Sequence, residues 1–207
     1  MNISCIVLAG GRSTRLGRNK VTEIIGEKSL LERVISCLAY FESDIIVVTA
    51  KKPTLPQRID YPKLKIVSDI HPGKGSLGGV YSGLVASNSF YNLVVACDMP
   101  FLNRKLLSYM VEISNGYDLV VPRLDDTFEP LHAVYSKGCI APMEYLIKQD
   151  DLKILKLFPL IKVRYAEKNE IDRFDPQHLS FFNVNTEADL KAGVKLAKRE
   201  EGIRDKC

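Results

Sequence analysis

Short apolar runs alternate with longer amphipathic segments along most of the chain. The runs are rich in Ile, Val and Leu and have the length of buried strands. Five of them are predicted strands: Ile3–Leu8, Asp44–Thr49, Leu64–Val67, Leu93–Ala96 and Leu119–Val121. Alternation of strands with helical segments is typical of βαβ units. The pattern therefore predicts an α/β fold of three Rossmann-like layers, in which a mainly parallel open sheet carries helices on both faces.

Two of the intervening segments have the spacing of amphipathic helices. Ser29 and Glu32 form a capping box, which predicts that a helix begins just after Ser29. The expected buried side of this helix consists of Leu30, Leu31, Val34, Ile35 and Leu38. The second segment follows a glycine-rich stretch, and Ser76 is its predicted N-cap. Its apolar positions are Leu77, Val80, Tyr81, Leu84 and Val85.

The pattern changes after about Pro122. Glu129–Tyr135 and Ile161–Tyr165 are predicted strands added to one edge of the sheet, with antiparallel pairing as an open alternative. A helix is expected near Cys139–Lys148. Antiparallel pairing of the added strands would make the sheet mixed at that edge.

The C-terminal part is predicted to be helical. Thr186 and Asp189 begin the final helix. One side of this helix carries Leu190, Val194 and Ala197. Residues 198–207 have mixed charge and few apolar side chains, which predicts a frayed tail. Because the sequence contains no linker, repeat or low-complexity segment, residues 1–207 are expected to form a single domain.

Composition narrows the class of protein. The net charge is +4 and the basic residues are scattered, so no nucleic-acid partner is expected. The five cysteines are odd in number and contain no C-x-x-C pair, which favours reduced thiols in the cytoplasm over disulfides or a zinc site. No signal peptide and no apolar run of membrane-spanning length is apparent. We therefore expect a soluble, cytoplasmic protein without a membrane partner.

The segment after the first predicted strand has the composition of a phosphate-binding loop. Its sequence is L-A-G-G-R-S-T-R-L-G-R-N-K. Glycines let backbone N–H groups approach an anion, and the cationic side chains neutralise it. Its glycine spacing fits neither a Walker A loop nor a dinucleotide-binding fingerprint. The loop is therefore predicted to bind a nucleoside phosphate, with contacts from Leu8, Ala9, Gly10 and Gly11.

A carboxylate is predicted to face this loop. Asp98 lies in A-C-D-M-P-F, where an apolar strand ends and Pro100 turns the chain. Asp98 meets the loop in one crevice if the first strand and Leu93–Ala96 are neighbours in the sheet. Arg15 and Lys20 are the cations best placed for the β and γ phosphates.

The carboxylate also predicts a metal ion. Beside a triphosphate, a bare carboxylate is repelled by about 4 kcal/mol for each charge pair at roughly 4 Å. A divalent cation reverses the sign of this interaction, and Mg²⁺ is the usual choice with one or two carboxylates. Asp98 is therefore the predicted metal ligand. Lys20, Asp98 and Arg15 are the predicted catalytic residues, and Lys20 and Asp98 are also expected to bind the nucleotide.

Four separated motifs resemble those of the molybdenum cofactor guanylyltransferase family. They are the glycine loop, G-K-G-S-L-G-G, D-M-P-F and F-x-N-x-N-T, and they span residues 3 to about 190. E-P-L-H, at Glu129 to His132, also matches a family segment, whereas Ser76 stands where the family pattern has proline. The resemblance implies a fold like that of the nucleotide-diphospho-sugar transferases. It also implies Mg²⁺-dependent transfer of GMP from GTP to the terminal phosphate of molybdopterin, with release of pyrophosphate.

The same resemblance implies partners and further site residues. The partners are GTP and molybdopterin (Mo-molybdopterin), with room for transient contacts to proteins that deliver molybdopterin or mature molybdoenzymes. Asp69 is implied to contact the nucleoside, although its position also suits a turn residue. Asn183 and Asn185 are implied to border the pocket for the pterin acceptor. Asn185 and Thr186 equally suit the cap of the last helix, so both interpretations stay open.

Two other functions stay open on the sequence alone. The first is a cytidylyltransferase acting on molybdopterin or a sugar phosphate. Such relatives usually carry L-A-A-G where this chain has L-A-G-G, and Gly10 favours guanine because it leaves room for backbone contact with a larger base. One methyl group, however, discriminates by only about 1–3 kcal/mol. The second is a non-catalytic nucleotide-binding module, against which the presence of both Lys20 and Asp98 argues.

The histidines bear on the mechanism. None of the three lies in a sequence arrangement typical of a covalent nucleophile. A phosphate monoester acceptor is already ionised and needs no general base, so guanylyl transfer can proceed by orientation and charge neutralisation.

Overall fold

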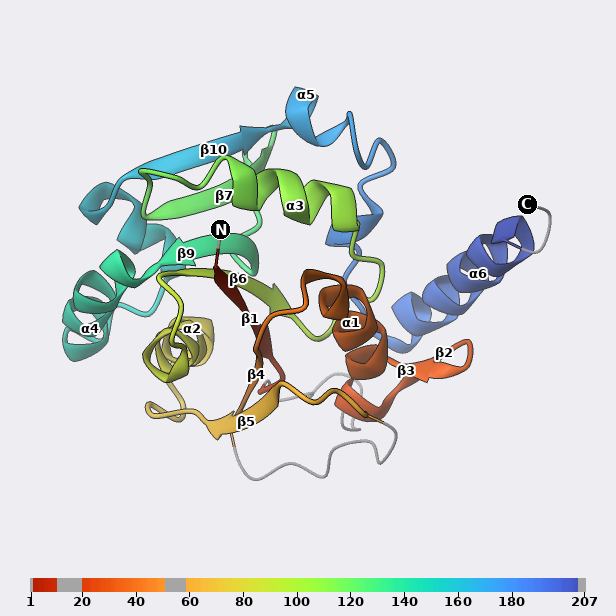
Figure 1. The fold of residues 1–207 in the computed structure, drawn as a ribbon, viewed down its shortest axis with the longest axis horizontal. Helices are drawn as coiled ribbons and strands as arrows, with labels where there is room; N and C mark the ends of the chain where they lie inside the picture. The colour runs from red at the N-terminus through yellow and green to blue at the C-terminus, as the bar shows by residue number, and fades with distance from the viewer. Residues whose placement is uncertain (1, 11–19, 51–58, 205–207) are drawn as a thin grey trace.

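The computed structural model describes residues 2–10, 20–50 and 59–204; the side chains of residues 20 and 200–204 are not described. Within these residues an eight-stranded sheet has the order β10-β7-β9-β6-β1-β4-β5, and β8 pairs with β7 (Figure 1). The strands are β1 (Ile3–Leu8), β4 (Ile45–Thr49), β5 (Leu64–Ser68), β6 (Tyr91–Ala96), β7 (Leu119–Leu124), β8 (Thr127–Phe128), β9 (His132–Ser136) and β10 (Val163–Glu167).

Helices cover both faces of this sheet, as the sequence predicts. They are α1 (Leu30–Leu38), α2 (Gly75–Ala86), α3 (Arg104–Glu112), α4 (Ile140–Lys148), α5 (Lys168–Ile171) and α6 (Glu187–Arg204). α1 and α3 pack on the face that buries Val7 and Val95, whereas α2 and α4 pack on the face that buries Ile6 and Val94 (Figure 1). Because the central strands are covered on both sides, they appear in the sequence as continuous apolar runs.

The four strands β5, β4, β1 and β6 are parallel neighbours, which confirms the predicted α/β fold with a mainly parallel core. From β1 the chain moves outward to β4 and β5 and then returns to β6 on the other side of β1. Leu8, at the end of β1, is in register with Ala96, at the end of β6. The strand order therefore reverses between β1 and β6, and open α/β sheets bind ligands at the carboxyl ends of such strands.

One strand differs from its prediction. The sequence predicts a strand at Glu129–Tyr135 on one edge, whereas the structure has β9 inside the sheet, antiparallel to both β6 and β7. Every residue of β9 is buried, which requires a neighbour on each side and cover on both faces. The outer strand in this region is β10, and it pairs parallel to β7. The antiparallel strand of this mixed sheet thus lies in its interior.

The start of α1 is formed as predicted. The Ser29 hydroxyl accepts a hydrogen bond from the Glu32 amide at 3.2 Å, and the Glu32 carboxylate accepts one from the Ser29 amide at 2.6 Å. All five predicted apolar positions are buried. A cap of this kind stabilises a helix by about 1 kcal/mol.

The structure has the helix that the sequence predicts at this place, α2, but the predicted N-cap is wrong. The helix begins at Gly75, so Ser76 lies inside it and is not the N-cap. Gly75 has a φ of +64°, a left-handed conformation that glycine adopts readily. The turn before the helix therefore ends at Gly75, one residue before the predicted N-cap Ser76. Of the apolar positions that predict this helix, Val85 is 44% exposed, whereas Leu77, Val80 and Leu84 are buried.

Glycines bring α2 very close to β1. A Cβ added at Gly83 would lie 2.5 Å from Cγ2 of Ile6, and one at Gly79 would lie 3.4 Å from Cδ2 of Leu8. Ile6 is branched at Cβ and fully buried, so it has little freedom to move away. Gly79 and Gly83 therefore allow α2 to pack closely under the first strand.

The substitution Gly83→Ala is expected to lower the free energy of unfolding by about 1–3 kcal/mol, because it overpacks this contact. Urea denaturation followed by circular dichroism measures the change. Val85→Ala is the control on the exposed side of the same helix, with an expected change below about 0.5 kcal/mol. An unchanged stability for Gly83→Ala would show that β1 and α2 can separate at no cost.

A third apolar cluster lies to one side of the sheet. It joins a hairpin, formed by β2 (Ile24–Ile25) and β3 (Lys28–Ser29), to α6. The hairpin and α6 both extend away from the sheet beside α1 (Figure 1). Its buried members are Ile25, Leu30, Phe101, Val184 and Ala197. The approach is close, because a Cβ at Gly193 would lie 2.6 Å from Cδ1 of Ile25.

The final helix begins where it is predicted. The Thr186 hydroxyl accepts a hydrogen bond from the Asp189 amide at 3.2 Å, which caps α6. The helix continues to Arg204, into the segment for which the sequence predicts a frayed tail. Among the described residues, no helix has both the length and the apolar character needed to cross a membrane.

Candidate active site

The ends of β1 and β6 bring two of the predicted segments together. The Cys97 amide donates a hydrogen bond to the Leu8 carbonyl at 3.1 Å, which continues the ladder of the two strands by one residue. Asp98 is the next residue, and its side chain is half-buried. The backbone of Asp98 therefore follows directly on the point where β6 meets the start of the glycine loop.

The first residues of that loop pack against the end of β4. The Ala9 amide donates to the Val48 carbonyl at 2.9 Å, and a Cβ added at Gly10 would lie only 2.9 Å from the Ala50 nitrogen. Gly10 thus allows two backbone segments to touch. Gly11 and Arg15 lie outside the described residues.

The structure describes only the backbone of Lys20. This residue begins a short 3₁₀ helix, Lys20–Thr22, which leads from the loop towards the β2–β3 hairpin. The position of its side chain is outside the described part of the structure.

Asp69 lies at the same edge of the sheet, after β5. Its amide donates to the Thr49 carbonyl at 2.8 Å. Its Oδ1 accepts hydrogen bonds from the His71 amide at 2.9 Å and from the Ser82 hydroxyl at 2.8 Å. These contacts show that Asp69 stabilises the turn after β5, and its predicted contact with the nucleoside stays a prediction.

The asparagine segment meets Asp98 from the other side. The Val184 amide donates to the Asp98 carbonyl at 2.9 Å, so Asn183 and Asn185 flank the residue that contacts Asp98. The Asn183 side-chain amide donates to the Phe181 carbonyl at 3.0 Å. The Asn185 amide donates to the Asp189 carboxylate at 3.0 Å, which makes it part of the cap of α6.

Sequence reasoning missed Asp175, which holds the segment before Asn183. The Asp175 carboxylate is buried and accepts hydrogen bonds from the amides of Leu179 and Ser180, at 3.1 and 2.8 Å. The Ser180 hydroxyl in turn accepts one from the Asn103 amide at 3.0 Å. Because Asp175 lies in a charged loop without periodic pattern, its sequence context carries no signal of this role.

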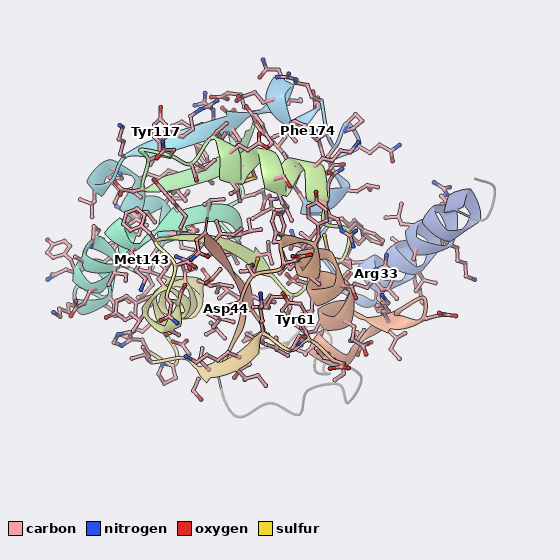
Figure 2. The ribbon with its side chains drawn as sticks, in the orientation of Figure 1. Arg33, Asp44, Tyr61, Tyr117, Met143 and Phe174 are labelled. Atoms are coloured by element: carbon pink, nitrogen blue, oxygen red, sulfur yellow. The ribbon has the colours of Figure 1, made fainter. Side chains whose placement is uncertain are left out.

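Arg33 is a second residue that the sequence did not single out. From α1 it donates to the carbonyls of Pro100 and Ile25, each at 3.4 Å, and its guanidinium carbon lies 5.0 Å from the centre of the Phe101 ring (Figure 2). Arg33 therefore ties the turn after Asp98 to the β2–β3 hairpin. The one sequence feature that could have pointed to Arg33 is its charge within the largely apolar stretch L-L-E-R-V-I.

The E-P-L-H segment borders the site next to β6. The Ala96 amide donates to the Leu131 carbonyl at 3.0 Å. Glu129 is half-buried, and burial raises the pKa of its carboxyl group. His132 is fully buried, and burial lowers the pKa of its imidazole to about 4, so the ring is neutral at pH 7.

Asp98 is the described carboxylate that directly follows the meeting of β1 and β6, so it is the candidate ligand for a divalent metal. No group of three or more His, Cys, Asp or Glu residues among the described residues could enclose a metal ion. Asp98 alone nevertheless fits an ion such as Mg²⁺, which proteins commonly hold with one or two carboxylates and with oxygens of the substrate phosphates. The donor set therefore suits a metal that arrives with a nucleotide, and it does not suit a permanently enclosed ion.

Comparison with known proteins adds a family match. The MobA-like NTP transferase domain matches residues 5–161 of this chain. A protein of Pelotomaculum thermopropionicum, named "Probable molybdenum cofactor guanylyltransferase", is 36% identical over 198 residues, which cover 95% of each chain. The match thus extends over nearly the whole sequence.

Solved structures agree with this match. The crystal structure of molybdopterin-guanine dinucleotide biosynthesis protein A from Archaeoglobus fulgidus has a TM-score of 0.81 and 29% identity, covering 95% of this chain and 99% of that one. A 2-C-methyl-D-erythritol 4-phosphate cytidylyltransferase from Thermus thermophilus has a TM-score of 0.67 at 16% identity, covering 96% and 100%. The second likeness shows a shared fold alone, that of the nucleotide-diphospho-sugar transferases.

Proposed function

The chain belongs to the MobA-like NTP transferase family, and from this premise we propose that it transfers GMP from GTP to the terminal phosphate of molybdopterin. The observation that carries the proposal is the meeting of three motifs at Asp98. The Cys97–Leu8 hydrogen bond joins Asp98 to the glycine loop, and the Val184–Asp98 hydrogen bond joins it to the asparagine segment. A nucleotide on one side of Asp98 and an acceptor on the other would have their reacting phosphates beside this carboxylate.

The reaction needs no proton transfer from the enzyme. An oxygen of the acceptor phosphate forms a bond to the α phosphorus of GTP, and the bond from that phosphorus to the bridging β oxygen breaks. Pyrophosphate leaves with the electron pair of the broken bond. Because the attacking oxygen is already ionised, the chain has to orient two anions and reduce their repulsion.

In this proposal the residues divide the work by position. Backbone amides at Leu8 to Gly11 hold the triphosphate, and Arg15 and Lys20 neutralise its β and γ phosphates. Asp98 would hold the divalent ion, proposed to be Mg²⁺, whose positive charge would reduce the repulsion between the phosphate groups. Asn183 and Asn185 line the acceptor side, and Asp69 shapes the nucleoside side through the turn that it stabilises.

GTP is the proposed donor because of the relatives that the chain resembles. Packing explains the glycine at position 10 in this chain, because a Cβ there would lie too close to the Ala50 nitrogen. The L-A-G-G sequence therefore does not by itself select a larger base. Proteins that deliver molybdopterin or receive the product are proposed as transient partners.

Incubation of the protein with GTP or CTP, Mg²⁺ and molybdopterin tests the proposal. Release of pyrophosphate is expected only with GTP and only in the presence of the acceptor. Omission of the acceptor is the control for simple hydrolysis. Turnover with CTP in place of GTP, or pyrophosphate release that does not depend on molybdopterin, would contradict it.

A further inference from the structure

His132 is an unusual buried residue. Its side chain is fully buried, and within the described residues neither ring nitrogen has a hydrogen-bond partner. A neutral imidazole carries one N–H donor and one acceptor nitrogen, so both are unsatisfied. Each buried polar group left without a partner costs about 1–3 kcal/mol.

The position of His132 connects it to the reacting groups. It is the first residue of β9 and is paired with Val95 of β6, three residues before Asp98. On its other side the imidazole ring packs edge-on against the Phe181 ring, with centres 4.9 Å apart. The Phe181 carbonyl accepts the hydrogen bond of the Asn183 side chain. His132 therefore lies between the Asp98 strand and the segment proposed to border the acceptor.

That segment is fixed at two places and turns between them. Asp175 holds the amides of Leu179 and Ser180 at one end, and Asp98 holds the Val184 amide at the other. Phe181 lies between these anchors and packs on the imidazole ring. Phe181 therefore links the imidazole ring to the stretch of chain between the two anchors.

Packing alone does not explain a histidine at this position. Phenylalanine has a similar flat ring, would keep the contact with Phe181, and would leave no buried polar atom without a partner. A residue whose polar atoms reduce the stability of the free protein is typical of functional sites.

We propose that His132 is a positioning residue for the acceptor: its imidazole hydrogen-bonds to the segment 179–185 when that segment closes on the bound phosphate monoester. The identity of the acceptor rests on the proposed function. Closure would bring Asn183 and Asn185 to the acceptor while His132 gains the partners that it lacks in the free protein. Loss of the imidazole nitrogens should then weaken acceptor binding and leave nucleotide binding intact.

The test compares His132→Phe with the wild type in two measurements. Titration of molybdopterin, followed by its pterin fluorescence, gives the Kd of the acceptor without GTP. We expect this Kd to rise about tenfold in His132→Phe, whereas the Kd of GTP stays within twofold. The thermal midpoint of His132→Phe is expected to equal or exceed that of the wild type. His132→Gln, which keeps a donor and an acceptor, is expected to recover part of the acceptor affinity.

Val134→Ala is the matched control, since Val134 lies two positions along β9 and packs in the core on the same face. It should lower the thermal midpoint and leave the acceptor Kd within twofold. A His132→Phe variant that melts below the wild type, or that binds acceptor as tightly, overturns the inference. If wild-type protein turns over GTP and molybdopterin and His132→Phe matches it, the inference alone fails. If the wild type neither binds nor uses molybdopterin, the proposed function fails at its acceptor.

Discussion

Asp98→Ala is expected to lower kcat for guanylyl transfer about a thousandfold. Without the carboxylate, a divalent ion loses its protein ligand between two phosphate groups that repel each other. One charge interaction at roughly 4 Å is worth about 4 kcal/mol at an effective dielectric of 20. A barrier change of this size corresponds to about a thousandfold in rate. Pyrophosphate release under saturating GTP and molybdopterin measures the effect.

GTP affinity should respond much less, because the proposal assigns the hold on the triphosphate to backbone amides and cationic side chains and not to Asp98. The Kd of GTP is expected to rise by less than about fivefold in Asp98→Ala. Asp126→Ala is the control, since it removes the same charge from an exposed position in the β7–β8 turn. Equal losses in kcat and in GTP affinity would favour the nucleotide-binding module over the enzyme.

The core of the fold could be predicted because its strands are buried on both faces. Ile3–Leu8 has the same bounds in sequence and structure, since six consecutive apolar or small residues admit few alternatives to a central parallel strand. The capping box at Ser29 was equally clear, because its two hydrogen bonds are local and need no tertiary partner. The sequence predicted that the glycine loop and Asp98 meet only if the first strand and Leu93–Ala96 are neighbours, and the pairing of β1 with β6 meets this condition.

The parts that could not be predicted depend on contacts distant in sequence. The interior position of β9 is decided by which strands its edges find, and an apolar run carries no information about its neighbours. Arg33 donates to the Pro100 carbonyl, which is distant in sequence, so no local spacing identifies it. The partners of Asp175 are only four and five residues further along the chain, but its loop has no periodic pattern that would single it out. Ser76 was mistaken for a cap because Gly75 already ends the preceding turn in a left-handed conformation.

His132 also makes the stability of the protein sensitive to acid. Burial lowers the pKa of its imidazole from 6.5 to about 4, while the charge of buried Asp175 acts in the opposite direction. Between these pH values the unfolded chain binds a proton that the folded protein does not, so acid favours unfolding. The stability associated with neutral His132 is complete above about pH 6.5 and is lost as the pH falls towards 4.

A wild-type protein moved from pH 7 to pH 4 is therefore expected to lose about 3 kcal/mol of unfolding free energy through His132 alone, at about 1.4 kcal/mol for each pH unit. Carboxylates contribute to acid unfolding as well, but they are the same in His132→Phe. The difference between the two proteins in urea denaturation at a series of pH values isolates the histidine. As the pH falls from 7, the free energy of unfolding of His132→Phe should rise relative to that of the wild type, and this difference should level off near pH 4. Parallel curves for the two proteins would mean that the imidazole is protonated as easily in the fold as in water, which full burial between β6 and Phe181 opposes.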